Sequence, residues 1–341
     1  MPMFRLFVLL ATLLALPAHA AETLKVYNWS EYMPQRVLDL FTNQTGITIT
    51  YVTYESNEEM YEQVKANPSE YDIVVPSTYF VSRMAREGML QKINKSKLPN
   101  IGNLDPRLMN LAHDPQNEYS IPYLWGTTAM FVDSAHVKTK LTSWADLWRP
   151  EFRNKVLLLD DMRDIFHIAL RTLGYSGSST NPKEIEAAYR KLLELKPNIV
   201  EFNSDSPKDA ILEDRAELGA IWNGEIFRAG EERYTVECIY PKEGAVMWVD
   251  SFAIPAGSKN SEAAHKFIDF LMKPGIAALA AEAYGYATPN RAAMKELDLW
   301  TRGSPVIYPS DEILKKASIH VDLGDATAVY EKYWKLFQEA K

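Results

Sequence analysis

Two kinds of hydrophobic pattern alternate along this chain. Short apolar stretches rich in β-branched and aromatic residues predict strands, and stretches with an apolar residue every three or four positions predict amphipathic helices. The predicted strands cover residues 24–27, 47–53, 71–75, 155–159, 199–202, 218–222 and 251–255. The predicted helices cover about 35–45, 58–66 and 261–272, and a further helix begins at 182. Because strands that alternate with such helices form βαβ units, we expect an α/β fold with mostly parallel sheets.

Residues with special backbone preferences support the ends of two helices. Gly46 is placed to end the first helix, and Asn181 is placed to cap the helix that starts with Pro182. The alternation of strands and helices starts twice, near residues 24 and 155, without repeats, low-complexity tracts or long linkers. We therefore expect two units joined by short strand-like crossings, with the cleft between them as the natural ligand site.

The first twenty residues have the pattern of a cleavable export signal. Arg5 gives it a positive start, residues 6–16 are apolar, and Ala18-His19-Ala20 is a small-x-small cleavage site. The apolar stretch is too short to span a bilayer well, and no second such stretch follows. No Cys lies near the cleavage site, so we expect cleavage after Ala20 and a soluble exported chain rather than a lipoprotein. The only Cys is Cys238, which excludes an internal disulfide.

The charge of the chain narrows the choice of partner. The 45 acidic and 37 basic residues give a formal net charge of −8. A nucleic-acid-binding protein favours a basic face, so this balance argues against such a partner. It is compatible with a cationic ligand, although a modest negative charge also serves solubility.

The segment Tyr27-Asn28-Trp29-Ser30-Glu31-Tyr32 places aromatic rings and a carboxylate just after the first predicted strand. A carboxylate flanked by aromatic faces can hold an organic cation, because the carboxylate supplies charge and the rings add cation–π attraction. The alternative is that Trp29 and Tyr32 belong to the core and that Glu31 is a solvated loop residue.

Further segments repeat this combination at the ends of strands or in turns, at residues 76–79, 160–164, 222–224, 248–250 and 285–290. Asp161 and Asp164 share a face of a first helical turn, where the alternative role is capping of the helix. Together these segments predict a cleft with aromatic walls and spread negative charge. The walls would be Trp29, Tyr32, Tyr79, Trp222, Trp248 and Tyr286, and the carboxylates Glu31, Asp161, Asp164 and Asp250.

Two rival classes of protein remain open at this stage. Paired acids in an aromatic cleft are also typical of a glycosidase, although the chain has no serine nucleophile elbow. A metal-binding transport protein would need ligands at suitable spacing, and the six His residues are scattered. His167 lies three residues after Asp164, and we expect it on the surface or on a helix face.

The sequence resembles a known family over essentially the whole chain that follows the export signal. It is similar to the periplasmic spermidine/putrescine-binding proteins of bacterial polyamine ABC transporters. The matching stretches are 27–32 (YNWSEY), 51–58 (YVTYESNE), 74–79 (VVPSTY), 119–123 (YSIPY), 142–148 (TSWADLW), 221–224 (IWNG) and 288–290 (TPN).

The resemblance implies a two-lobed periplasmic binding protein fold of type II. Two mostly parallel sheets flanked by helices would be joined by a hinge, with the ligand in the inter-lobe cleft. The first lobe would comprise residues 21–127 and about 251–297, and the second about 128–250 and 298–341. The family function is capture of a polyamine in the periplasm and delivery to an inner-membrane ABC transporter permease. It implies no catalysis, cofactor or metal, no nucleic-acid partner, no membrane-embedded part and a monomeric state.

The resemblance also implies which residues bind the ligand. The first lobe would supply Trp29, Ser30, Glu31, Tyr32, Ser77, Tyr79 and Tyr286, the second Asp161, Asp164 and Trp222, and the hinge region Trp248 and Asp250. His320 would complete the set.

Three of these positions depart from the closest spermidine binders. Asp164 stands where they carry Glu, His320 where they carry Gln, and Ser30 where they carry Thr. A protonated His320 would be a like charge beside an ammonium group. We therefore expect polyamine affinity to fall as pH drops through the histidine range, and a shorter pocket that favours a shorter amine such as putrescine.

Overall fold

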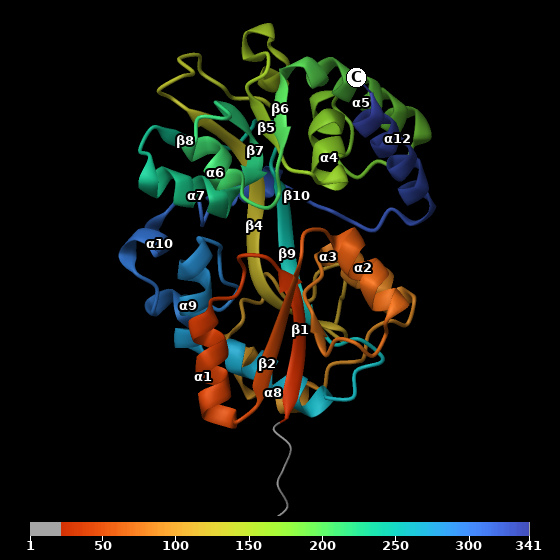
Figure 1. Cartoon of the computed structure of the whole chain (residues 1–341), viewed down its shortest axis with the longest axis vertical. Helices are drawn as coiled ribbons and strands as arrows, with labels where there is room; N and C mark the ends of the chain where they lie inside the picture. Colours follow the sequence, from red (N-terminus) through yellow and green to blue (C-terminus); the bar gives the residue numbers. More distant parts are fainter. Residues whose placement is uncertain (1–21, 341) are drawn as a thin grey trace, which may run out of the picture.

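The computed structural model describes residues 22–340 (Figure 1). The predicted export signal and its cleavage site lie outside the described residues. The lower half of the molecule in Figure 1 contains three parallel strands with helices on both sides. These elements are β1 (Thr23–Trp29), α1 (Gln35–Thr45), β2 (Thr48–Tyr54), α2 (Asn57–Ala66), β3 (Ile73–Val74), α3 (Thr78–Arg86), α8 (Ser261–Leu271) and α9 (Pro274–Tyr284).

The upper half contains a second parallel group, which is also flanked by helices (Figure 1). Its elements are β5 (Val156–Leu158), α4 (Met162–Thr172), α5 (Pro182–Leu195), β6 (Ile199–Phe202), α6 (Pro207–Leu212), β7 (Leu218–Trp222), α7 (Asn223–Glu232), β8 (Val236–Ile239) and α12 (Thr327–Glu339). The remaining elements are α10 (Leu299–Gly303), α11 (Asp311–Lys316), β10 (Ser318–Ile319) and short 3-10 helices at 95–97, 99–103, 144–148, 150–152, 196–198, 293–295 and 324–326.

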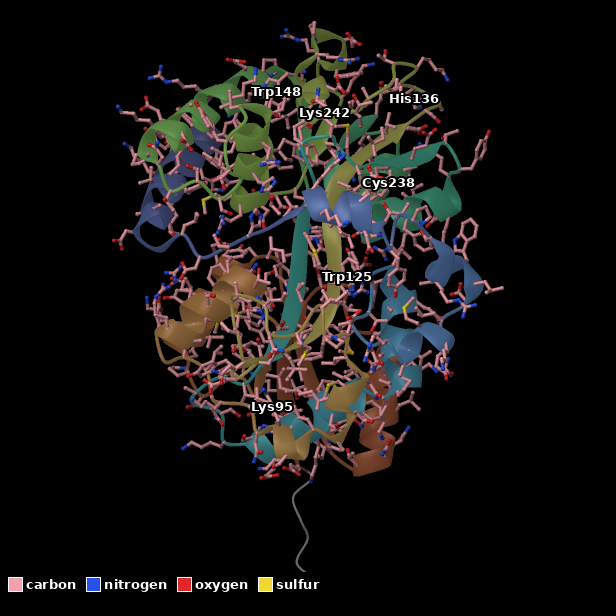
Figure 2. All side chains as sticks on the ribbon, turned by 180° about the vertical axis from the view of Figure 1, so that it is seen from behind. Lys95, Trp125, His136, Trp148, Cys238 and Lys242 are labelled. Carbon is pink, nitrogen blue, oxygen red and sulfur yellow. The ribbon has the colours of Figure 1, made fainter. Side chains whose placement is uncertain are left out.

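Two long antiparallel strands, β4 (Ser120–Asp133) and β9 (Val246–Ala253), connect the halves. Seen from behind, they run from one half to the other, with Trp125 of β4 midway (Figure 2). β9 pairs with β3 and β4 pairs with β7, so the two parallel groups join into one continuous sheet. Eight of its ten strands follow the order β2-β1-β3-β9-β4-β7-β5-β6, while β10 pairs with β9 and β8 pairs with β4. The predicted lobe boundaries fall within β4, within β9 and just before α10. The division into lobes stays a prediction.

The structure has helices α1 and α5 where the sequence predicts them, with the predicted residues at their ends. Helix α1 buries Val37, Leu38 and Phe41 and ends at Gly46, whose φ of 74° is a left-handed conformation that glycine adopts without strain. The Asn181 side chain accepts a hydrogen bond from the Lys183 backbone N–H at 3.1 Å, which confirms the predicted cap.

The main difference from the predicted elements is β4. All 14 residues of this strand are buried, so it has none of the alternation that marks a half-exposed strand. Pro122 also argues against a central strand, and the register shifts between Pro122 and Leu124, where a bulge accommodates the missing N–H. The strand predicted at 71–75 shortens to residues 73–74, and the one predicted at 251–255 is the end of the longer β9.

Among the described residues, no helix combines the length and apolar character that crossing a membrane requires.

Candidate ligand-binding site

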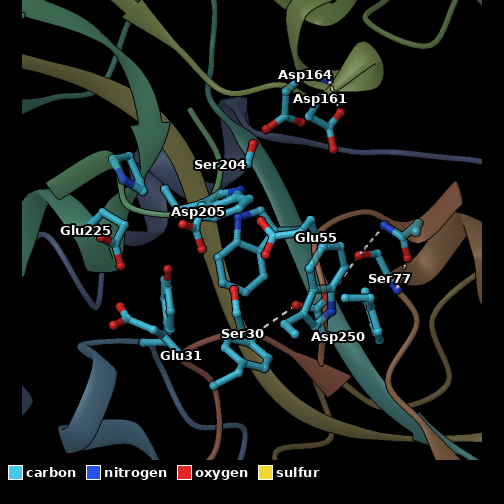
Figure 3. A pocket seen from close by; sticks show the side chains of 18 of the residues that line it. Ser30, Glu31, Glu55, Ser77, Asp161, Asp164, Ser204, Asp205, Glu225 and Asp250 are labelled. Atoms are coloured by element: carbon cyan, nitrogen blue, oxygen red, sulfur yellow. Dashed lines mark hydrogen bonds between the residues drawn. The ribbon is translucent and has the colours of Figure 1, made fainter. Parts of the chain in front are cut away.

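A cavity that is partly open to solvent lies between the two halves, against β9 (Figure 3). Its lining includes every residue that the sequence predicts for the ligand site: Trp29, Ser30, Glu31, Tyr32, Ser77, Tyr79, Asp161, Asp164, Trp222, Trp248, Asp250, Tyr286 and His320. The fold explains this convergence. Residues 29–32, 77–79, 161–164 and 222 follow or end parallel strands, and the carboxyl ends of the two parallel groups face each other across the cavity.

Asp250 is a buried carboxylate held by two hydroxyl groups. The Ser77 hydroxyl donates to Oδ1 at 2.6 Å, and the Tyr32 hydroxyl donates to Oδ2 at 2.8 Å. Asn57 supports this arrangement, because its Nδ2 donates to the Ser77 hydroxyl at 3.1 Å and its Oδ1 accepts from the Ser77 backbone N–H at 3.0 Å. Burial raises the pKa of Asp250 to about 7, although the hydrogen bonds from Ser77 and Tyr32 lower it. Asp250 is therefore an under-compensated charge that a cation would stabilise.

Aromatic side chains form a connected wall beside Asp250. The Tyr286 ring makes edge contacts with Tyr32 and Trp248, at centroid distances of 5.4 Å and 5.2 Å. Gly224, at the start of α7, lets Tyr286 approach closely: a Cβ at this position would lie 2.3 Å from the Tyr286 ring. This wall provides apolar surface for the methylene groups of a ligand.

A second aromatic pair lies where β1 and β2 end. Trp29 and Tyr54 pack at 4.7 Å, and both donate to the Val75 carbonyl, from the Trp29 indole N–H at 2.9 Å and from the Tyr54 hydroxyl at 2.6 Å. These bonds fix the Trp29 ring at the edge of the cavity.

Asp161 and Asp164 lie together on another side of the cavity, at the start of α4 (Figure 3). Asp161 is the N-cap: its Oδ1 accepts from the backbone N–H groups of Arg163 and Asp164 at 2.8 Å and 2.9 Å. The capping alternative is therefore confirmed, and the same residue also lines the cavity. Burial raises the pKa of Asp161 to about 6, with a further contribution from the charge of Asp164. Burial also raises the pKa of Asp164 to about 6, against a lowering by its hydrogen bond from Thr128.

His320 reaches the cavity because β10 pairs with β9 and because the Thr78 hydroxyl donates to the His320 carbonyl at 3.1 Å. Its Nε2 lies 2.8 Å from Asp164 Oδ1. Burial lowers the pKa of His320 to about 3, the charge of Arg163 lowers it further, and Asp161 opposes this. Burial therefore opposes the protonation of His320 that was expected in the ordinary histidine range.

Of the two positions expected for His167, the surface is wrong and the helix is right, since the residue lies within α4. This residue is 1% exposed, and its ring packs edge-on against His320 at 5.4 Å. Burial lowers the pKa of His167 well below its ordinary value. Every residue of its helix, α4, from Met162 to Leu170 is buried, which the three-residue spacing from Asp164 did not indicate.

Glu31 lies at the side of the cavity away from Asp161 and Asp164 (Figure 3). Its φ of 47° is a left-handed conformation, unusual for a residue with a side chain. Glu31 Oε2 accepts from Arg228 Nη2 at 2.7 Å, and the same nitrogen donates to Glu225 Oε1. The carboxylate of Glu31 thus already has a cationic partner from α7.

The sequence interpretation missed eight residues that line the cavity: Tyr54, Glu55, Asn57, Thr78, Ser204, Asp205, Pro207 and Glu225. Tyr54, Glu55 and Asn57 fall inside the matching stretch 51–58, which was a usable signal. Glu225 and Arg228 lie three residues apart just after Trp222-Asn223-Gly224, a spacing that places them on one helix face. The loop 204–207 carries no pattern that singles it out.

The balance of charge around the cavity is strongly negative. Its lining includes seven carboxylates: Glu31, Glu55, Asp161, Asp164, Asp205, Glu225 and Asp250. Within residues 22–340, Arg228 is the only Arg or Lys side chain ion-paired with any of them. The arrangement can therefore accept several positive charges.

The described residues also include one group with metal-ligand geometry, away from the cavity, formed by Asp133, His136 and Asp214. The Arg233 guanidinium pairs with Asp133 at 3.1 Å and with Asp214 at 2.6 Å. A protein cation therefore already compensates these acids.

Comparison with known proteins now defines the family. Residues 37–305 match the model of a family described as bacterial extracellular solute-binding protein. This chain belongs to that family. Its relatives include the spermidine/putrescine-binding periplasmic protein of Salmonella typhimurium, 50% identical over 322 residues that cover 93% of this chain and 92% of that protein. They also include the putrescine-binding periplasmic protein SpuD of Pseudomonas aeruginosa, 36% identical over 331 residues that cover 91% and 90%.

Among solved structures, the chain is similar to one titled a putative spermidine/putrescine ABC transporter from Listeria monocytogenes. The TM-score is 0.91 at 34% identity, and the match covers 94% of this chain and 100% of that chain. This similarity confirms the predicted fold class of a periplasmic binding protein, with the refinement that β4 and β9 join its two parallel groups into one sheet.

Proposed function

We propose that this protein captures a polyamine, spermidine or putrescine, in the periplasm and delivers it to the permease of an inner-membrane ABC transporter. The names of its relatives in the family support this ligand class. In this proposal the protein is a monomer that binds without chemical turnover and needs no metal or cofactor.

One observation carries the proposal: a cavity with seven carboxylates, aromatic walls and a single ion-paired arginine. A polyamine is a string of ammonium groups separated by methylenes. Each ammonium needs a carboxylate or several acceptors once water is removed, and the methylenes need apolar walls. The spacing of carboxylates then discriminates against a ligand whose amines would be left unpaired.

We further propose that the thirteen predicted residues form the ligand site and that the two halves act as the predicted lobes. Hinge closure around the ligand is a known property of periplasmic binding proteins as a class. Here it would bring Asp161 and Asp164 toward Asp250, and exclusion of water would strengthen each ion pair.

Calorimetric titration tests the proposal directly. The protein is first unfolded, dialysed and refolded to remove any copurified ligand, and then titrated with putrescine, spermidine and spermine. We expect a 1:1 complex with at least one of them at about micromolar affinity or tighter, equivalent to about 8 kcal/mol or more. Butane-1,4-diol, which has the length of putrescine without its charges, should not bind. Flat titrations with all three polyamines on folded protein would refute the proposal, and turnover of oligosaccharides would favour the glycosidase alternative.

Intrinsic fluorescence gives a second readout of the same event. Trp29, Trp222 and Trp248 line the cavity, and the indole N–H of Trp248 is buried without a hydrogen-bond partner among the described residues. Their emission should shift saturably with ligand, at the midpoint that calorimetry gives. Calorimetric binding without any shift would show that these rings do not contact the ligand.

A further inference from the structure

Arg228 bridges two carboxylates at one end of the cavity. Its Nη2 donates to Glu31 Oε2 at 2.7 Å and to Glu225 Oε1, so one guanidinium serves both acids. Glu31 comes from the loop after β1 in the lower half, and Glu225 and Arg228 come from the first two turns of α7 in the upper half. The bridge therefore spans the cavity between the halves.

This bridge leaves hydrogen-bonding capacity unused. Glu225 is 5% exposed, and within residues 22–340 neither its Oε2 nor the buried Nε of Arg228 has a hydrogen-bond partner. Burial raises the pKa of Glu225, and the positive charge of Arg228 opposes that rise. Glu225 thus lines the cavity with one buried oxygen that has no hydrogen-bond donor among the described residues, and its charge depends on Arg228 for compensation.

The geometry of an ammonium ligand is incompatible with this guanidinium. An ammonium that reached Glu31 or Glu225 would lie within a few ångströms of Arg228, and the repulsion between the like charges would be strongest beside the buried Glu225. The other five lining carboxylates, including Asp161, Asp164 and Asp250, have no such Arg or Lys partner in the described part of the chain.

We infer that Arg228 is a specificity-determining residue, whose guanidinium occupies the acidic end formed by Glu31 and Glu225 in place of an additional ligand ammonium. This inference rests on the proposed polyamine function and extends it to the choice of ligand. With Arg228 in place the cavity favours a diamine over a triamine, because the third ammonium of the longer ligand lacks a free carboxylate at this end.

The test is the change in selectivity of an Arg228→Met variant, which removes the charge and keeps an apolar stem of similar length. The dissociation constants for putrescine and spermidine are measured by calorimetry on ligand-stripped protein. We expect the affinity for spermidine to rise at least tenfold while that for putrescine changes less than threefold. An Arg228→Gln variant, which keeps a hydrogen-bond donor for Glu225, should shift the ratio in the same direction and serves if the methionine variant does not fold.

Two further variants separate this mechanism from a general effect of charge. Arg190→Met removes an exposed arginine of α5 that pairs with Glu186, and it should leave the ratio unchanged. The triple variant Glu31→Gln/Glu225→Gln/Arg228→Met lacks both vacated carboxylates and should lose the gain for spermidine.

The inference fails if the ratio of the two dissociation constants in both single Arg228 variants stays within threefold of the wild type. It also fails if the triple variant gains as much as Arg228→Met alone, because Glu31 and Glu225 would then not hold the third ammonium. If the wild type binds both polyamines and only the selectivity shift is missing, the proposed function stands without this inference. If the wild type binds neither, the proposed function itself is wrong, and the inference falls with it.

Discussion

Replacing Asp250 with Asn should stabilise the ligand-free protein and at the same time remove most of its affinity for a polyamine. Asp250 is 6% exposed and accepts hydrogen bonds only from the neutral hydroxyls of Ser77 and Tyr32. No Arg or Lys in the described residues pairs with it, so its ionised form carries a desolvation cost that the ligand is expected to relieve.

The magnitude follows from the pKa. Burial raises the pKa of Asp250 from its ordinary 3.8 to about 7. At about 1.36 kcal/mol per pKa unit, the difference corresponds to a destabilisation of about 4 kcal/mol when the group is fully ionised. An Asn side chain accepts through one oxygen instead of two, which costs about 1 kcal/mol of hydrogen bonding. We expect a net gain of about 2–3 kcal/mol in the free energy of unfolding at pH 8.

The pH dependence has a definite sign. A carboxyl whose pKa is higher in the folded state binds its proton more tightly when folded. The destabilisation is therefore absent below pH 3.8, grows as pH rises toward 7, and is complete above it. The advantage of Asp250→Asn should be largest at pH 8 and should shrink steadily toward pH 4.

The assay is urea unfolding of ligand-stripped wild type and variant at pH 8, 6 and 4.5, followed by calorimetric titration with putrescine and spermidine at pH 8. Loss of the carboxylate should weaken binding by about 2–5 kcal/mol, since it leaves a desolvated ammonium unpaired.

Asp146→Asn is the matched control. Asp146 is also buried, but its Oδ2 accepts from the backbone N–H groups of Thr142 and Ser143 at 2.7 Å and 3.0 Å, and it lies outside the cavity lining. This variant should lose stability and keep its affinity. An Asp250→Asn protein that is less stable than the wild type at pH 8, or that binds as well, would refute the reasoning.

Two other changes probe the walls and the titration of the site. Gly224→Ala should weaken polyamine binding at least tenfold in calorimetry, because the added Cβ would displace the Tyr286 ring. Gly275→Ala is the control, since a Cβ at that position would have no atom within 4 Å, and it should keep its affinity. Equal affinities of the two variants would contradict the assignment of Tyr286 to the cavity wall. The affinity of the wild type for a polyamine should fall as pH drops from 8 to 5. Burial raises the pKa of Asp250 to about 7 and that of Asp164 to about 6. Both groups therefore take up protons in this range and lose the charge that attracts an ammonium. His320→Gln should keep this pH response, because burial lowers the pKa of His320 to about 3; a variant that loses the response would show that His320 titrates in this range.

Local signals in the sequence determined much of the fold. The apolar periodicity and the ends marked by Gly46 and Asn181 predicted α1 and α5, because a helix is set by neighbours three and four residues away. The resemblance to a family predicted thirteen site residues, and all of them lie in the lining of the cavity. These features could be predicted because helix formation depends on residues close in sequence and because the family resemblance extends over essentially the whole chain that follows the export signal.

The tertiary structure alone decided how the charges in the cavity are compensated. Asp164 and His320 are 156 residues apart, and their contact exists because β10 pairs with β9. The distance in sequence between Glu31 and Arg228 is 197 residues. A pKa depends on burial and on charges within a few ångströms, and neither quantity is encoded in local patterning. The sequence therefore identified thirteen of the side chains that line the cavity. The packing of the two halves decided that burial opposes protonation of His320, that no Arg or Lys among the described residues pairs with Asp250, and that Arg228 pairs with Glu31.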